Sequence, residues 1–340
     1  MLRFVGRSVG ALVLTSVLAH GAVAQGNLPR AASIATNPQG SLFYSVGSAF
    51  AKVLSGALPT NVNVRPFTGP TLFIPMLHGG ELAFGLNNLV DAHMYYNGTK
   101  PWPRFEGVRL VTPVFRLYST MIVPGNSDIK SIADAKGKRV AADFRAHLIS
   151  RFSSQALLAS AGLKFKDFRP VPVASHSHGV RALMEGRVDI AYGAVGPPVV
   201  REANAALPGG VRFLPVGGNH KAMQEFLPGV GVEKVRAGFF RGIIKEPTDL
   251  VTNDVYFVSG LKTSDELVYA TTKAIWEKIA DLKKAHRALR AKLSHKWMVQ
   301  SVVTLPYHRA AIRFFKEQGA WTDAADKNHR ANLAKQNQPH

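Results

Sequence analysis

The sequence predicts an α/β protein made of two similar lobes that face each other across a cleft. Short apolar runs alternate with helical patterns along most of the chain, which is typical of parallel strands joined by helices. The same order of strand, helix and strand occurs once in each half. A chain of 340 residues is also too long for one small core and suits two domains. Since clefts between lobes are favoured ligand sites, the prediction already indicates where a ligand would bind.

Residues 1–24 are expected to be a secretory signal peptide. Arg3 and Arg7 supply a positive start, residues 9–19 form an apolar run, and residues 22–24 (AVA) offer small side chains for cleavage. The run is too short to span a bilayer. The sequence contains no Cys, so a lipid anchor at that point, a disulfide and a thiolate metal site are all excluded. We therefore expect a soluble mature protein in the periplasm.

The formal net charge of +20 indicates attraction to anions. A nucleic-acid partner is not expected, because an exported protein rarely meets one and no basic helix or aromatic RNA-binding motif is present. The densest basic run, residues 283–292, is interpreted as a solvated helix face. The alternative is a bias toward anionic ligands or toward docking on an acidic transporter.

The first lobe is expected to comprise residues 25–118 and 250–320. Its strands are predicted at 32–36, 62–67 and 81–86, with a helix from Ser41 to about Ser55 and another that ends at Gly79 and Gly80. Near the other end, residues 254–258 are expected to return to this lobe as a strand, followed by helices over 265–284 and 308–318. Residues 321–340 are polar and are expected to form a frayed tail.

The second lobe is expected to comprise residues 119–249. Strands are predicted at 108–113 and 120–123, before and after the lobe boundary, and within the lobe at 138–142, 168–173 and 188–192. Helices are predicted at 129–136, 150–161 and 179–185, the last two ended by glycines.

Several segments in a fixed order carry a resemblance to a known family. They are residues 34–47 (IATNPQGSLFYSVG), 68–69 (TG), 79–86 (GGELAFGL), 95–98 (YYNG), 129–140 (IKSIADAKGKRV), 161–163 (AGL) and 182–191 (ALMEGRVDIA). In order and spacing the chain resembles TAXI-type solute receptors, the periplasmic components of TRAP transporters, over about residues 32–320. The resemblance implies a type II periplasmic-binding-protein fold that closes on its ligand. It also implies a separate permease driven by an ion gradient, and small carboxylate ligands that include amino and keto acids.

The loops that follow the predicted strands of the first lobe carry the candidate ligand-binding residues. A turn between a strand and a helix start leaves free backbone N–H groups at the positive helix end, which favours an anion. Each candidate has an alternative structural role: Ser41 as a helix cap, the glycines as turns, the aromatic residues as core and the asparagine amides as turn formers. The candidates are Gln39, Gly40, Ser41, Phe43, Tyr44, Thr68, Gly69, Asn87 and Asn88.

In the second lobe, Arg145 is the leading candidate. The family pattern implies a small Gly- and Ser-rich turn after the strand at 138–142, whereas this chain has residues 143–147 (DFRAH). A guanidinium there could replace the lost backbone site with a two-pronged contact to a carboxylate, unless Arg145 points outward as a surface base. Gly193 and Val195 are expected to form an apolar wall of the cleft. His176 and His178 are expected to be solvated, with no metal and no cofactor.

The sequence argues against an enzyme. It has no Gly-x-Ser-x-Gly elbow and no His-Glu-x-x-His, and its 22 acidic residues are not paired at a revealing spacing. An exported hydrolase is therefore the weaker rival. A ligand sensor of the same fold, which passes its signal to a membrane partner, stays open as an alternative. A neighbouring gene for a TRAP permease would decide between this sensor and a transport receptor.

Overall fold

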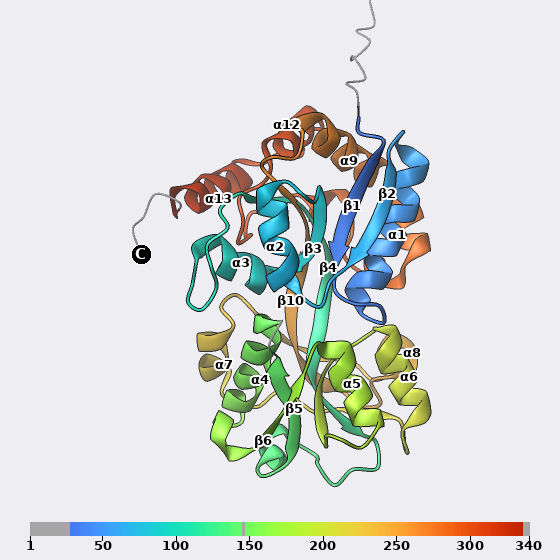
Figure 1. Cartoon of the computed structure of the whole chain (residues 1–340), viewed down its shortest axis with the longest axis vertical. Helices are drawn as coiled ribbons and strands as arrows, with labels where there is room; N and C mark the ends of the chain where they lie inside the picture. Colours follow the sequence, from blue (N-terminus) through green and yellow to red (C-terminus); the bar gives the residue numbers. More distant parts are fainter. Residues whose placement is uncertain (1–27, 145–146, 336–340) are drawn as a thin grey trace, which may run out of the picture.

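The computed structural model describes residues 28–144 and 147–335, and every structural statement below concerns these residues. Figure 1 shows two α/β lobes, one above the other, with two long strands running between them. One sheet of ten strands extends through both lobes, in the order β2-β1-β3-β10-β4-β7-β5-β6, and β8 and β9 pair with β4 and β10. Both lobes therefore share a continuous backbone frame, and the predicted α/β class is confirmed.

The first lobe is built on three parallel strands, each followed by a helix. Its elements are β1 (Ala31–Thr36), α1 (Leu42–Ala57), β2 (Asn61–Pro66), α2 (Pro70–Gly79), β3 (Phe84–Asn88) and α3 (Leu89–Asn97). The third strand starts later than expected, and Asn87 and Asn88 are its last two residues instead of a following turn. Rings of Phe50 and Phe84 pack on Phe257, with centroid distances of 5.2 and 5.1 Å, and join the helix layer to the sheet.

Two long antiparallel strands connect the lobes, β4 (Val108–Pro124) and β10 (Thr248–Gly260). The sequence predicted two short strands at 108–113 and 120–123, and the structure shows one strand of 17 residues. Pairing with β10 shifts register twice, between Val255 and Tyr256 and between Phe257 and Val258. Pro113 lies at the first of these irregularities, where a proline's missing N–H is tolerated, so it does not end the strand.

The second lobe repeats the alternation of strands and helices. Its elements are η1 (Ile132–Ala135), β5 (Arg139–Phe144), α4 (Leu148–Ser160), η2 (Phe165–Asp167), β6 (Arg169–Val173), α5 (His176–Met184), β7 (Ile190–Ala194), α6 (Pro198–Ala206), β8 (Val211–Phe213), α7 (His220–Phe226), β9 (Gly231–Val235) and α8 (Phe239–Gly242). The helix expected at 129–136 is a single 3₁₀ turn.

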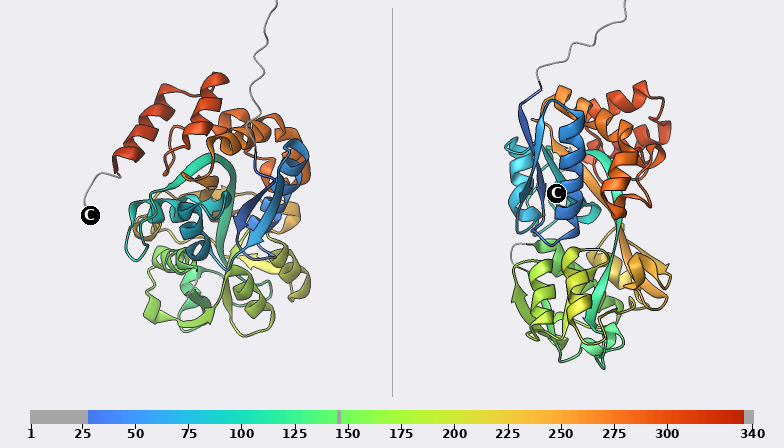
Figure 2. Two further views of the ribbon diagram at one scale, coloured as in Figure 1. Left: turned by 45° about the horizontal axis from the view of Figure 1, so that its top comes forward. Right: turned by 90° about the vertical axis from the view of Figure 1, so that its right-hand side faces the viewer.

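The C-terminal segment adds helices to the first lobe. They are α9 (Asp265–Glu277), α10 (Ile279–Ala285), η3 (Arg287–Leu289), α11 (His295–Met298), α12 (Arg309–Glu317) and α13 (Asp323–Ala334). The single helix expected at 265–284 is interrupted at Lys278. Figure 2 shows α12 and α13 on the first lobe, at the end far from the second lobe.

The expectation of a frayed C-terminal tail is wrong for residues 323–334. The Oγ of Thr322 accepts a hydrogen bond from the N–H of Ala325 and starts helix α13. Asn332 is only 2% exposed, and its carbonyl accepts a hydrogen bond from the hydroxyl of Tyr96 at 3.2 Å. Polar composition predicted disorder here because few large apolar residues are present, but caps and buried polar contacts hold the helix in place. Among the described residues, no helix is long and apolar enough to cross a membrane.

Candidate functional site

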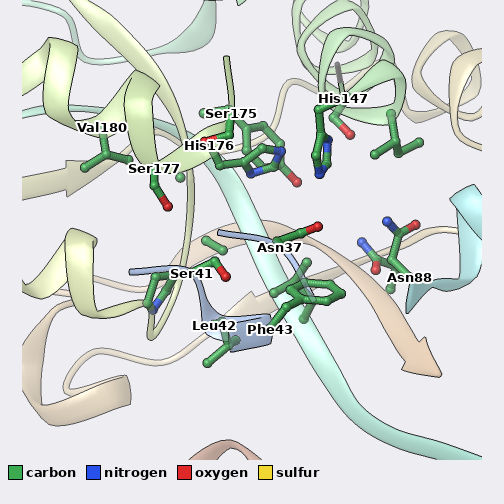
Figure 3. A pocket seen from close by; sticks show the side chains of 18 of the residues that line it. Asn37, Ser41, Leu42, Phe43, Asn88, His147, Ser175, His176, Ser177 and Val180 are labelled. Carbon is green, nitrogen blue, oxygen red and sulfur yellow. The ribbon is translucent and has the colours of Figure 1, made fainter. Parts of the chain in front are cut away.

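A cavity lies between the two lobes, and side chains from both lobes form its wall (Figure 3). The first lobe contributes Asn37, Ser41, Phe43 and Asn88, and the second contributes His147, Ser153, Ser175, His176, Ser177 and Gly193. Asn253, on the long strand β10, also reaches it. The cavity is small, with a volume of about 60 Å³. The described conformation is therefore one in which the lobes close tightly around a small space.

In the described part of the chain, five helices begin at this cavity: α1, α3, α4, α5 and α6. Residues in their first turns or caps line it. Polar caps fix three of these starts. The Oγ of Ser41 accepts from the N–H of Tyr44 at 3.1 Å, the Oδ1 of Asn88 accepts from the N–H of Val90 at 3.0 Å, and Ser175 caps α5. Helix N-termini carry partial positive charge and N–H groups without intrahelical partners. Their convergence makes the cavity attractive to an anion.

The remaining wall is apolar. Side chains that share this character come from both lobes and from the connecting strands: Leu42, Phe43, Val90, Leu117, Ile149, Leu157, Val180, Val199, Val200, Leu227, Val230 and Val251. Among the side chains that the structure describes, in residues 28–144, 147–240 and 243–335, no Lys, Arg, Asp or Glu lines the cavity. The positive character of the described wall therefore comes from backbone dipoles and not from charged side chains.

Two imidazoles are among the polar side chains that the second lobe contributes to the wall. The rings of His147 and His176 lie 4.8 Å apart, and the Oγ of Ser150 contacts the Nδ1 of His147 and the Nε2 of His176. Because Ser150 has one proton, it donates to one imidazole and accepts from the other. Burial lowers the pKa of His147 to about 4, and burial together with His147 lowers the pKa of His176. Both rings are consequently neutral at pH 7.

His147 has one atom free for a ligand. The side chain is 3% exposed, and its Nε2 has no hydrogen-bond partner among the described residues. Figure 3 shows its ring directed toward Asn37 and Phe43 on the opposite wall. Ser150 itself does not line the cavity, so its contact with two imidazoles does not present a nucleophile to a bound molecule.

The carboxyl group of Asp91 is buried next to Asn88, a residue of the cavity wall. The Nδ2 of Asn88 donates to the Oδ2 of Asp91 at 2.9 Å, and Asp91 is 1% exposed. Burial raises the pKa of Asp91 to about 7, against the opposing effect of the hydrogen bond from Asn88. Since the Oδ1 of Asn88 caps α3, most of this amide is used within the fold, which leaves one N–H of Asn88 for a ligand.

The structure brings four of the predicted site residues to the cavity and leaves the others out of its lining. Ser41, Phe43, Asn88 and Gly193 line it, and Phe43 also packs edge-on against Phe115 at 6.0 Å, so it serves both wall and core. The predicted residues that do not line the cavity are Gln39, Gly40, Tyr44, Thr68, Gly69, Asn87 and Val195. Arg145 lies outside the described residues.

The residues that miss the cavity have identifiable local roles. Gln39 is exposed, whereas the carbonyl of Gly40 accepts a hydrogen bond from the N–H of Val199 in the other lobe at 3.3 Å. Gly69 precedes α2, whose start does not reach the cavity. Val195 is buried in the core of the second lobe. Asn87 is fully buried with no partner for its amide among the described residues, and the structure gives no reason for this.

Sequence reasoning missed eight polar residues of the described wall: Asn37, His147, Ser153, Ser175, His176, Ser177, Tyr192 and Asn253. Asn37 follows directly after strand β1 and His147 precedes helix α4, so position next to an element end was the available signal. The expectation of a solvated His176 is wrong, because it lines the cavity, whereas His178 is exposed as expected. In the part of the chain that the structure describes, no three His, Cys, Asp or Glu side chains are grouped to hold a metal ion.

Comparison with known proteins agrees with this architecture. The model of a family described as NMT1-like matches residues 34–319. The structure of PhnD1 from Prochlorococcus marinus (MIT 9301), in complex with methylphosphonate, superposes with a TM-score of 0.52 at 14% identity, covering 86% of this chain and 100% of that one. An ancestral arginine-binding protein bound to arginine gives a TM-score of 0.50 at 16% identity, covering 77% and 98%. These likenesses confirm the predicted type II periplasmic-binding-protein fold, with two α/β lobes around a central cleft.

Proposed function

The chain belongs to the NMT1-like family, and from that premise we propose that it is a periplasmic receptor that binds a small organic anion in the cleft and delivers it to a membrane permease. The observation that carries the proposal is the convergence of five helix starts on one cavity between the lobes. Each N-terminus stabilises a nearby negative charge by about 0.3–1 kcal/mol, and more where the site is partly buried. Several such ends together favour an anion without any basic side chain in the described wall.

Ligand capture follows from the division of the wall between the lobes. Asn37 and Ser41 belong to the first lobe and His147 and Ser175 to the second, so only a closed form presents both sets to one ligand. The lobes already touch in this structure: the ring of Trp102 lies 4.4 Å from that of Phe152 on α4. Because the cavity is small, a ligand enters when the lobes separate and selects the closed form when they return.

The finer parts of the proposal rest on the sequence. Export depends on residues 1–24 acting as a signal peptide, and the partner is a TRAP-type permease driven by an ion gradient, as the resemblance to TAXI-type receptors implies. Arg145 remains our candidate for a second-lobe contact to the anionic group. No catalytic residue is assigned. The Oγ of Ser175 in the wall does contact the Nδ1 of His178 at 2.8 Å, but this serine is 1% exposed and caps α5.

The proposal is tested by ligand screening. Purified mature protein is heated with a panel of small carboxylates, sulfonates and phosphonates, and compounds that raise the unfolding temperature are measured by calorimetry. At least one is expected to bind without being consumed. A panel that stabilises nothing would refute the anion receptor, and turnover of a bound compound would favour an enzyme.

A matched pair of serine variants tests the site. Ser41 and Ser264 both cap a helix, but only Ser41 lines the cavity. Ser41→Ala and Ser264→Ala are each expected to lower stability by about 1 kcal/mol through loss of the cap. Only Ser41→Ala is expected to weaken binding of the anion, by about tenfold. Equal affinities in the two variants would place the ligand elsewhere. Uptake by vesicles that contain a candidate TRAP permease, with and without the receptor, tests the partner.

A further inference from the structure

We propose that this site is selective for an organic monoanion with a short apolar body and no ammonium group, so that it accepts 2-oxo, 2-hydroxy or simple branched acids and rejects the α-amino acid of the same skeleton. The inference rests on the proposed function and narrows its ligand class.

The distribution of charge carries the argument. No acidic side chain lines the cavity in the described part of the chain, and residues 1–27, 145–146 and 336–340 contain no Asp or Glu in the sequence. The buried carboxyl of Asp91 is separated from the cavity by Asn88, whose Nδ2 donates to it. A ligand ammonium would thus be desolvated without a carboxylate partner and would face the positive ends of helices. The carboxylate of the same ligand meets neither penalty.

Unpartnered polar atoms indicate a second contact, independent of the helix ends. His147 and Asn253 line the cavity, and both residues are at least nine-tenths buried, at 3% and 9% exposure. The Nε2 of His147 and the Oδ1 of Asn253 have no hydrogen-bond partner in the described structure. The Nε2 of His147 donates to a carbonyl or hydroxyl of the ligand in the tautomer that carries its proton, and the Oδ1 of Asn253 accepts a hydrogen bond from a ligand hydroxyl. Neither can neutralise a full positive charge.

The apolar body is inferred from the rest of the wall. Phe43 and Leu42 on the first lobe, Leu157 and Val180 on the second, and Val251 on β10 all line the cavity. A cavity of about 60 Å³ restricts the occupant to a short skeleton. An apolar branch gains by burial against these side chains, whereas a second carboxylate would be buried among them without a charged partner in the described wall.

The test compares four ligands that share one carbon skeleton. They are 3-methyl-2-oxobutanoate, 2-hydroxy-3-methylbutanoate, 3-methylbutanoate and valine. Calorimetry is expected to show that the three acids bind and that valine binds at least about 100-fold more weakly. Valine as tight as the acids would overturn the inference and leave the anion receptor intact. If none of the four binds while another anion of the larger screen does, the argument for a short branched body fails. If no anion binds at all, the proposed function fails.

A designed carboxylate tests the cause of the selectivity. Asn253→Asp places a negative charge in the wall, and Asn63→Asp makes the same change at an exposed position on β2. Asn253→Asp is expected to weaken the binding of 3-methyl-2-oxobutanoate by at least about tenfold. It is expected to reduce the ratio of the affinities for this acid and for valine by a similar factor. The Asn63→Asp protein should behave as the unmodified one. An unchanged ratio of the two affinities in a folded Asn253→Asp protein would contradict the charge argument. Asn37→Asp, on the first lobe, provides the same test should Asn253→Asp fail to fold.

Discussion

Replacing Asp91 with Asn is expected to stabilise the protein at alkaline pH and to change its pH dependence. Asp91 is 1% exposed, and burial raises its pKa from 3.8 to about 7. An acid whose pKa is higher in the folded state favours folding when protonated, so its contribution is lost as pH rises from about 4 to 7. At 1.36 kcal/mol for each tenfold change in the proton equilibrium, ionisation of this buried group costs about 4 kcal/mol above pH 7. The Oδ1 of an Asn at this position can still accept the hydrogen bond from Asn88.

The assay is urea unfolding from pH 4 to pH 8. The free energy of unfolding of Asp91→Asn minus that of the unmodified protein is expected to rise by up to about 4 kcal/mol over this range. Taking the difference removes the contributions of the histidines, which are common to both proteins. Asp128→Asn, at an exposed position, serves as the matched control and should give a flat difference. A difference that is equally flat for Asp91→Asn would show that the carboxyl is not destabilised by burial.

Three further predictions concern the wall and the contact between the lobes. Burial lowers the pKa of His147 to about 4, so its contribution to stability is present above pH 6.5 and is lost as pH falls toward 4. Between these pH values, the free energy of unfolding of His147→Gln, measured in urea, should fall by about 3 kcal/mol less than that of the unmodified protein. Trp102→Ala removes a buried ring that packs on Phe152 of the other lobe. It should lower the free energy of unfolding by about 3–5 kcal/mol. An unchanged midpoint of urea unfolding would rule out the contact. In Gly193→Ala the new Cβ would approach the side chain of Ile122 to 2.7 Å and should cost about 1–3 kcal/mol in thermal unfolding, whereas Gly56→Ala meets no atom within 4 Å and should be neutral or slightly stabilising.

The order of the elements could be predicted because it depends on local pattern. Helix α1 was expected to start at Ser41 and is capped by it, and the strand expected at 168–173 is observed as β6 over Arg169–Val173. Errors arose where long-range contacts override local signals. Pro113 suggests a strand end, but the irregular pairing with β10 lets β4 continue past it. The polar composition of residues 323–334 suggests fraying, but the contact of Asn332 with Tyr96 holds the helix.

The candidate site was predictable only in part, for a related reason. Ser41 lies between a strand and a helix, and Asn88 ends a strand directly before a helix, so their place at the cavity could be inferred from the strand-end rule. Asn253 lies within β10, and only the passage of that strand between the lobes brings it to the wall. His176 lies in the first turn of α5 and contacts Ser150 on α4, and no spacing along the chain encodes that contact.

The pairing of β4 with β10 has a consequence for the order in which the protein can form. Ser119 lies opposite Val251, so the chain leaves the first lobe and returns to it at neighbouring points. Topologically, the second lobe is an insertion into the first. Strand β3 pairs with β10, which is synthesised almost half a chain length later. During synthesis or translocation from the N-terminus, the inserted lobe can therefore complete most of its strands while the lobe that emerged first is still missing its central one.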